Sequence, residues 1–321
     1  MSHSSANPQL NPLADPQDAA IIIEGLQKTY AGGTHAVRDV SLTVARGSIF
    51  GLLGPNGAGK STIINILAGT VKKSAGQVII DGYDIDRHGL LARQRIGIVP
   101  QETNFDPFFS PFETLETQAG YFGVRKADRR TQELLEVMGL GDKVHANTRD
   151  LSGGMRRRLM VAKALVHDPP ILVLDEPTAG VDVELRNKLW AYVSELRNKG
   201  VTIILTTHYL YESEKLCDTL AIVNKGTIIA LDQKDALLAR LGTKKITVQL
   251  RESITDLPEG LAEIGGAIDD EGQVVVTYGR EGEGQIETVL AKIQSAGLAI
   301  TDIKTSQTSL EDIFVELTGE Q

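Results

Sequence analysis

Cysteine and long apolar runs are both scarce in this sequence. Cys217 is the single cysteine among 321 residues, so the chain forms no internal disulfide and is compatible with a reducing compartment. No unbroken apolar stretch approaches the ~18 residues that a membrane-spanning helix needs. Residues 1–19, rich in Ser, Asn, Pro, Asp and Gln, lack the apolar segment of a signal peptide. We expect a disordered tail on a cytoplasmic protein.

A surplus of basic residues is also missing. The net charge is −9, which argues against the electrostatic footprint of a nucleic-acid-binding protein. Residues 1–242 hold 27 Lys and Arg against 27 Asp and Glu, whereas residues 243–321 hold 6 against 15. This shift, and a length above that of one typical domain, predict a domain boundary near Gly242.

Residues 20–242 alternate strand-like and helix-like segments, which is typical of an α/β fold. Residues 20–30 and 37–48 read as a start rich in β-hairpins, and residues 49–53 as a short buried strand before a glycine-rich loop. Continuous runs of β-branched residues and leucine indicate parallel strands buried on both faces. These runs cover 95–100, 171–175 and 201–207. Helices are predicted at 60–68, 127–138, 153–166 and 183–198.

Residues 243–321 predict a small α+β accessory domain. Strands are expected in 245–250, 273–279 and 299–305, and a helix at 285–297. The segment SLEDIFVELTG places Ser309 and Asp312 at the spacing of a capping box, with Gly319 as the stop of a final helix.

The most specific motif is GPNGAGKST at 54–62. Gly54, Gly59, Lys60 and Ser61 match the P-loop pattern between a strand and a helix. Glycines allow successive backbone N–H groups to surround phosphates at a helix N-terminus. Lys60 is placed to reach the β and γ phosphates, and the Ser61 hydroxyl to ligate Mg²⁺.

Further polar side chains stand at predicted strand ends, where open α/β sheets bind ligands. ILVLDEP ends in two adjacent carboxylates, and Gln101 and His208 follow two other strands. Asp175 is expected to hold Mg²⁺, and Glu176 to polarise a water for attack on the γ-phosphate. An isolated LDE is common, so this interpretation depends on the P-loop.

Seven motifs together resemble those of the ABC transporter ATP-binding subunit, over roughly 20–235. They are Tyr30, GPNGAGKST, Gln101, LSGGM at 151–155, ILVLDEP, AGVD at 179–182 and His208. The resemblance implies a P-loop NTPase fold, with a mixed sheet core, an antiparallel β subdomain and a helical subdomain at about 102–168. The expected domains are a tail (1–19), an ATP-binding domain (20–242) and the acidic α+β domain (243–321).

The resemblance also implies roles for individual residues. Two chains would pack head to tail, so that the signature of one closes over the ATP of the other, with Asp182 at the seam. The catalytic residues would be Glu176, His208 and Gln101, and the Mg²⁺ ligands Ser61, Gln101 and Asp175. The residues expected at ATP are Tyr30, Gly54, Pro55, Asn56, Gly57, Ala58, Gly59, Lys60, Ser61, Thr62, Ser152, Gly153, Gly154 and Asp182.

Two features of the sequence leave alternatives open. Five of the seven phenylalanines fall within 105–122; Phe105, Phe108, Phe109 and Phe112 suit an irregular loop, which either docks a permease or packs a small helical subdomain. Arg156 to Arg158 contact phosphate or permease, or form a solvated helix face, which we favour. The resembled family more often has glutamine at Met155, and the loop AGVD differs from the commoner small-Ala-Leu-Asp pattern while keeping its aspartate.

The C-terminal domain resembles that of ATPases serving ABC-2-type exporters, of the YadG and daunorubicin-resistance type. We therefore expect an ATPase on the cytoplasmic face of the inner membrane that drives a separately encoded permease. The permease selects the substrate, so this chain does not identify it. The alternatives are a soluble ABC ATPase without transport, a GTPase, for which NKG at 224–226 lacks the required aspartate, and a regulatory cassette without activity.

Overall fold

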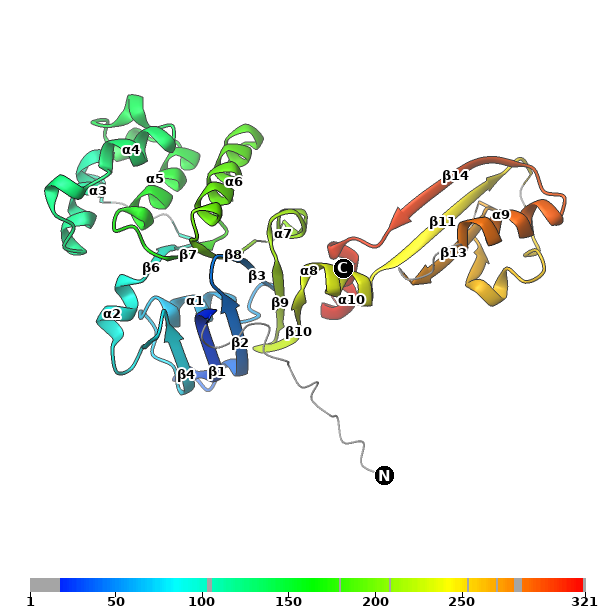
Figure 1. Cartoon of the computed structure of the whole chain (residues 1–321), viewed down its shortest axis with the longest axis horizontal. Coiled ribbons are helices and arrows are strands. Elements are labelled where there is room, and N and C mark those ends of the chain that lie inside the picture. The colour runs from blue at the N-terminus through cyan, green and yellow to red at the C-terminus, as the bar shows by residue number, and fades with distance from the viewer. Residues whose placement is uncertain are drawn as a thin grey trace. The chain divides into compact units, whose positions relative to one another are not determined.

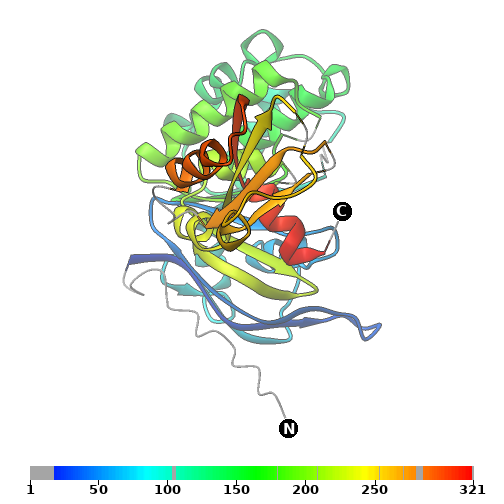
Figure 2. The same cartoon turned by 90° about the vertical axis from the view of Figure 1, so that its right-hand side faces the viewer.

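A computed structural model describes residues 18–102, 106–178, 180–207, 209–252, 254–269, 271–279 and 285–319. The chain forms two compact units, Met1–Asp232 and Gln233–Gln321, shown in Figures 1 and 2. Residues 1–17 of the predicted tail lie outside the described residues, as do Phe105 and His208, whereas Ala19 already belongs to the first strand.

The first sheet of the first unit is antiparallel and contains the predicted hairpin. Its order is β2-β1-β4-β5, and Ile22 of β1 lies opposite Thr43 of β2 and Ile79 of β4. Buried and more exposed side chains alternate along much of β1, so one face of the strand packs against the core. The strands are β1 (Ala19–Thr29), β2 (His35–Ala45), β4 (Ala75–Ile80) and β5 (Tyr83–Asp84).

The second sheet has the order β10-β9-β3-β8-β7-β6. The pairs β9–β3, β3–β8, β8–β7 and β7–β6 are parallel, and every residue of β3, β7 and β8 is buried, as their apolar runs predict. Parallel pairing brings their carboxyl ends to one edge. The strands are β3 (Ile49–Leu53), β6 (Ile96–Val99), β7 (Ile171–Asp175), β8 (Thr202–Thr206), β9 (Thr219–Asn224) and β10 (Thr227–Gln233).

Helix α1 (Lys60–Leu67) joins the cores of the two sheets. Its buried face, which includes Ile63 and Ile66, belongs to the same apolar cluster as Ile21 of β1 and Phe50 of β3. Burial of each such side chain contributes roughly 1.5–3 kcal/mol. The P-loop helix is therefore held on both sides, which fixes the position of the loop before it.

Three helices form a separate group beside the second sheet, seen at the upper left of Figure 1. Helix α3 (Pro111–Tyr121) packs on α4 (Thr131–Val137) and α5 (Gly153–Leu165), and α5 packs on β6 and β7. Ser110 caps α3 in a capping box with Glu113, so the irregular segment predicted around the phenylalanines ends before Phe112. The other helices of this unit are α2 (Gly89–Gln94), α6 (Val183–Asn198) and α7 (Leu210–Leu216).

The described residues of the second unit form an antiparallel sheet with three α-helices. Its strand order is β12-β13-β11-β14, and Ile246, Val276 and Ile293 lie in its core. Ser309 and Asp312 form the predicted capping box, and Gly319 ends the last helix in the left-handed region. The elements are α8 (Lys234–Leu241), β11 (Thr243–Leu250), β12 (Gly266–Ile268), β13 (Val274–Gly279), α9 (Gln285–Ser295), β14 (Ile300–Gln307) and α10 (Leu310–Thr318).

The division between the units falls before α8, whereas the charge pattern placed it near Gly242. Leu237 and Leu238 of α8 are buried, and the helix contacts β13. Because α8 carries basic and acidic residues together, its composition does not differ from that of the first unit, and packing alone assigns it to the second.

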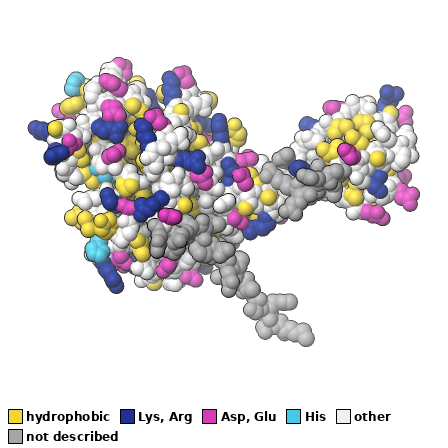
Figure 3. Space-filling view, in the orientation of Figure 1, with side chains coloured by type: hydrophobic (Ala, Val, Ile, Leu, Met, Phe, Trp, Pro, Cys, Tyr) yellow, Lys and Arg dark blue, Asp and Glu magenta, His cyan; other side chains and the backbone are white. Residues whose placement is uncertain are grey.

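The surface drawn in Figure 3 mixes both signs of charge over the first unit, with Lys and Arg side chains interspersed among Asp and Glu. Within the described ranges, no helix is both long enough and apolar enough to cross a membrane.

Candidate functional site

The loop between β3 and α1 needs its glycines. Gly54 has φ 153°, and a Cβ there would lie 2.2 Å from the Val223 carbonyl oxygen. Gly59 caps α1 with φ 111°, and its Cβ would lie 2.5 Å from the Ala36 carbonyl oxygen. Other residues would be strained and would clash at both positions, so the tight loop follows directly from the sequence.

Lys60 is buried in this loop, with 9% of its surface exposed. Its Nζ donates to the Gly54 carbonyl at 2.5 Å and to the Pro55 carbonyl at 2.9 Å. The ammonium group therefore lies across the loop at the N-terminus of α1, where the helix dipole adds positive potential. This arrangement suits an anionic ligand.

A cavity of about 330 Å³ brings the P-loop together with the polar side chains predicted at the ends of two strands. It is lined by Ala36, residues 56–62, Gln101, Asp175 and Glu176. Gln101 Nε2 lies 3.4 Å from Glu176 Oε2, although the two residues are 75 positions apart in the chain. The ends of β6 and β7 thus present an amide and a carboxylate to the P-loop.

Asp175 ends β7 and is 5% exposed. Burial raises the pKa of its carboxyl above the ordinary value; the hydrogen bond from the Thr206 hydroxyl to Oδ1, and the charges of Arg157 and Lys60, oppose that rise. Asp175, Ser61 and Gln101 offer carboxylate, hydroxyl and amide oxygens to one cavity, the hard ligands that Mg²⁺ prefers. Among the described residues no three His, Cys, Asp or Glu cluster as a metal site.

Glu176 adopts an uncommon backbone conformation. Its φ is +49°, in the left-handed region that costs a residue with a Cβ of order 1–3 kcal/mol. Its N–H donates to the Thr206 carbonyl at 3.0 Å, which fixes the turn after β7. Such strain is concentrated at functional sites, and here it directs the carboxylate toward Gln101.

Tyr30 lies beside the P-loop. Its hydroxyl is 3.4 Å from Thr62 Oγ1, and the Lys28 ammonium is 4.8 Å from the centre of its ring. The side chain is 39% exposed, so an aromatic surface is available next to the phosphate loop.

The signature residues begin α5. Ser152 caps the helix by accepting from the Met155 N–H at 3.2 Å. A Cβ at Gly153 or Gly154 would meet nothing within 4 Å, and neither glycine has a positive φ. Packing among the described residues therefore gives no reason for the glycines, and Ser152 to Gly154 are not among those lining the cavity at the P-loop.

Asp182 is placed in a similar way, as the N-cap of α6. Its Oδ1 accepts from the Leu185 N–H at 3.0 Å. The residue is exposed, and so remains accessible at the start of its helix.

The prediction that Arg156 to Arg158 form a solvated helix face is wrong for Arg157, which is 3% exposed. Its Nη1 donates to the carbonyls of Pro100 at 2.5 Å and Gln101 at 2.9 Å, and its Nη2 to that of Glu176 at 2.6 Å. The carbonyls of Asp175 and Pro177 accept from it as well. One guanidinium from the signature helix thus joins the segment after β6 to the segment after β7.

Arg158 is buried too, and its Nη1 donates to the carbonyls of Met138 and Gly139, at the end of α4. Three consecutive arginines read from sequence as a charged surface because burial of a guanidinium is costly. Only the surrounding carbonyls, contributed by distant segments, make that burial acceptable.

Glu212, like Arg157, is a buried charged residue next to the site that sequence reasoning missed. Its carboxylate is 5% exposed and accepts from the hydroxyls of Thr207 at 3.0 Å and Thr178 at 3.1 Å. Thr207 directly precedes His208, which lies outside the described residues. Glu212 therefore links the segment before His208 to the segment after Glu176.

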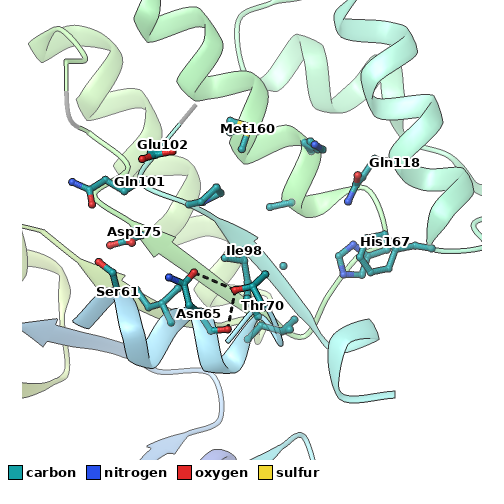
Figure 4. A pocket seen from close by; sticks show the side chains of 18 residues that line it. Ser61, Asn65, Thr70, Ile98, Gln101, Glu102, Gln118, Met160, His167 and Asp175 are labelled. Atoms are coloured by element: carbon teal, nitrogen blue, oxygen red, sulfur yellow. Dashed lines mark hydrogen bonds between the residues drawn. The ribbon is translucent and has the colours of Figure 1, made fainter. Parts of the chain in front are cut away.

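A larger cavity of about 650 Å³ adjoins this site between α1, β6, α3 and α5. Figure 4 shows Ser61, Gln101 and Asp175 at one end and Gln118 and His167 at the other. The His167 ring stacks on Phe122 with centroids 3.7 Å apart, and burial lowers the pKa of His167 to about 4.

The described phenylalanines of the 105–112 segment differ in exposure. Phe108 is 79% exposed under the Arg149 guanidinium at 5.2 Å, and Phe109 is 39% exposed. Phe112 is half-buried against His145, with ring centroids 5.6 Å apart. Phe112 packs within the helical group, whereas Phe108 and Phe109 remain accessible.

Comparisons with known proteins agree with this geometry. Residues 37–179 match the family described as ABC transporter. The Nod factor export ATP-binding protein I of Ralstonia nicotianae is 37% identical over 93% of this chain and 94% of its own length. The daunorubicin resistance ATP-binding protein DrrA3 of Streptomyces coeruleorubidus is 35% identical over 94% of this chain and 97% of its own.

A solved structure extends the comparison to the fold. It is a dimeric ATP-binding cassette in a post-hydrolysis state bound to ADP and Pi; it matches with a TM-score of 0.62 and 25% identity, over 67% of this chain and 98% of its own. The full-length relatives thus cover a much larger share of this chain than the solved cassette does.

Proposed function

This chain belongs to the ABC transporter family as an ATP-hydrolysing subunit, and on that premise we propose that two copies close on two ATP molecules and drive a separately encoded export permease. The cavity that joins the P-loop to Gln101, Asp175 and Glu176 carries the proposal. Relatives named for Nod factor export and for daunorubicin resistance, which cover almost the whole chain, support an ABC-2-type exporter over a soluble ATPase without transport.

The P-loop binds the nucleotide phosphates. Backbone N–H groups of residues 56–62 and the Lys60 ammonium neutralise the β and γ phosphates, and Tyr30 stacks on the adenine. Ser61, Gln101 and Asp175 are the residues that would hold Mg²⁺, which supplies charge neutralisation at the phosphates when bound. The oxygen donors lining the cavity support this assignment.

Glu176 is the general base in this proposal. Its carboxylate accepts a proton from the attacking water, while the Gln101 amide, 3.4 Å away, orients that water. His208, which follows Thr207 in the sequence, contacts the γ-phosphate in this proposal. A positioned base contributes typically 10²–10⁴-fold to the rate.

The second copy completes each site. Ser152, Gly153 and Gly154 donate to the γ-phosphate held by the other chain, and Asp182 lies at the seam between the chains. The open space around both glycines supports this assignment. The chain's own packing does not explain why these two residues are glycines, whereas a close approach by another molecule does. The twofold arrangement makes two equal sites.

The permease docks on the helical group from the cytoplasmic side of the inner membrane. Phe108 and Phe109 are exposed beside the start of α3, and aromatic side chains are enriched in the cores of protein interfaces. The permease, rather than this chain, selects the exported substrate.

The substitution Glu176→Gln tests the assignment of the base. We expect ATP binding to persist, a closed dimer to accumulate, and phosphate release to fall by about 10²-fold or more, because the water loses its proton acceptor. Chromatography with ATP and a phosphate-release assay measure the two effects.

The matched control is Glu195→Gln, which removes an exposed carboxylate paired with Lys199 on α6; it should keep full turnover. Hydrolysis by Glu176→Gln at the rate of the unaltered protein would remove Glu176 from the mechanism.

A further inference from the structure

The sheet of the second unit ends in an uncovered edge strand. β14 pairs only with β11 among the described strands and lies at the border of its sheet in Figure 1. Residues 301–306 are all exposed, and Ile303 is 40% exposed although it lies opposite the fully buried Val248. A long exposed edge of this kind is a template for pairing with another strand.

The backbone groups of alternate residues point away from β11. The Ile303 N–H donates to Asp302 Oδ1 at 2.8 Å. In an antiparallel pair the hydrogen-bonding groups alternate in direction, so Thr305 also presents its N–H and C=O groups outward. The alternation stops at Thr301, where the pairing with β11 shifts register and the Thr301 hydroxyl donates to the Gln249 carbonyl at 3.0 Å. The free edge therefore offers Ile303 and Thr305 for an antiparallel ladder.

We propose that β14 pairs antiparallel with β14 of a second copy, about a twofold axis at Ile303. This register places Ile303 opposite itself as a hydrogen-bonded pair, and Thr305 opposite Thr301. Asp302 of each chain then lies opposite Lys304 of the other, in the closer non-hydrogen-bonded positions. The strand is thus complementary to its own reversed copy in hydrogen bonds, charge and apolar contact.

The charges select this register over its neighbours. A shift by two residues in one direction places Asp302 opposite Asp302, and a shift in the other places Lys304 opposite Lys304. Like charges directly opposite each other are destabilising, whereas opposite charges stabilise. The Asp302 carboxylate that accepts from the Ile303 N–H exchanges that partner for Lys304 of the other chain.

This inference rests on the proposed ATP-driven dimer and gives the second unit a role in it. A single pair of short strands binds weakly. Two chains already joined through their ATP sites hold their β14 strands at an effective concentration that reaches the millimolar range for flexible connections. The edge contact would keep the two subunits associated after ATP is hydrolysed and the cassettes separate.

Cross-linking of the full chain through Ile303→Cys tests the contact. The two cysteines would face each other with Cα atoms about 5.5 Å apart, within the range of a disulfide. The matched control is Val315→Cys on α10, because Val315 is 39% exposed. The native Cys217 is buried, so the unaltered chain should not cross-link.

We expect Ile303→Cys to form covalent dimers under mild oxidation about tenfold faster than Val315→Cys, because pairing aligns the cysteines. ATP in a Glu176→Gln background should increase the difference. Equal rates for the two sites would overturn the inference, and so would a cross-link to a membrane protein in place of a second copy.

The charge pair supplies a second test. In the Ile303→Cys chain, Lys304→Asp puts two carboxylates opposite each other and should return cross-linking to the control rate. The exchange Asp302→Lys with Lys304→Asp restores opposite charges and should restore the rate. Failure of the exchange to do so contradicts the register.

These outcomes separate the inference from the function on which it rests. A closed ATP dimer of Glu176→Gln with no preference for Ile303→Cys would reject the β14 contact alone. Persistent β14 cross-linking without any ATP-dependent dimer would instead reject the shared ATP site, and the contact would remain as an ATP-independent interface.

Discussion

Arg157 shows how a single residue can control the spacing of a site that it does not line. Its guanidinium donates to carbonyls on both sides of the cavity, among them Gln101 and Glu176. Burial lowers the pKa of Arg157, and the carboxylates of Asp175 and Glu176 oppose this effect. A rotation of the signature helix would therefore move the segments that carry the amide and the base. Arg157 is a positioning residue.

Replacing Arg157 tests this role. Arg157→Lys keeps the charge but loses the planar fork of donors, so we expect kcat to fall about 10–100-fold while ATP affinity stays within about threefold. Arg157→Met leaves buried carbonyls without donors and should also destabilise the protein by about 2–3 kcal/mol.

Phosphate release, nucleotide titration and thermal unfolding measure the three effects of the Arg157 variants. Arg125→Met, which removes a guanidinium that is 84% exposed and paired with Asp128, serves as the control. Full turnover by Arg157→Lys would show that the contacts serve folding only.

His167 predicts a pH dependence of stability. Its pKa is lowered from 6.5 to about 4 in the folded chain, so the unfolded chain binds the proton first as the pH falls. The contribution of His167 to the free energy of unfolding is therefore fully present above about pH 6.5. It decreases toward pH 4, with a slope of up to about 1.4 kcal/mol per pH unit.

Urea unfolding of the unaltered protein and of His167→Gln between pH 7 and pH 5 isolates this contribution. The variant should show the shallower pH dependence. Parallel curves would mean that His167 titrates normally in the folded protein.

At the scale of elements, three helix starts carry residues that we propose to contact nucleotide. α1 begins at the P-loop glycine Gly59, α5 at Ser152 and α6 at Asp182. Each N-terminus presents N–H groups and a positive partial charge. The start of α1 lines the cavity of its own chain, whereas the start of α5 has open space around both glycines, where we propose that a second chain binds.

The substitution Ser152→Arg tests that division. We expect ATP binding by the P-loop of the same chain to change less than about threefold, and turnover to fall by about 10²-fold or more, because the side chain blocks the site shared between chains. Nucleotide titration and phosphate release distinguish the two.

The control for Ser152→Arg is Ser309→Arg, which removes an equivalent helix cap in the second unit and costs about 0.5–2 kcal/mol of stability only. Loss of ATP binding by Ser152→Arg at low protein concentration would mean that both loops serve one nucleotide.

At the scale of the whole molecule, the two units have different proposed roles. The first unit contains every described residue proposed to bind or hydrolyse ATP, and the second contributes an edge strand and most of the net negative charge. The solved cassette covers about the share of the chain that the first unit occupies.

A chain ending after Asp232 separates these contributions. We expect its ATP affinity as a monomer to stay within about twofold, and its ATP-dependent dimer to form only at about tenfold higher protein concentration, because the link through β14 is gone. Analytical ultracentrifugation with ATP measures the dimer. Unchanged dimerisation would assign the second unit another role.

The sequence alone predicts those features that depend on local chemistry. The P-loop, the buried strands β3 and β7, helix α6 and the capping box of α10 follow from glycine geometry, apolar runs and cap spacing. Such signals occupy a few consecutive residues, so they remain visible without the fold. The short helices α2 and α7 lacked them and were not predicted.

Only the tertiary structure decides which distant groups meet. It turns Arg157 inward because carbonyls from two separate strand ends surround it, buries Glu212 between two threonines, and assigns α8 to the second unit through Leu237 and Leu238. A charged residue is stable in the interior only when its partners are already placed there. The sequence alone therefore determined which residue types occur at the site. The contacts that hold these residues in position were decided only by the tertiary structure.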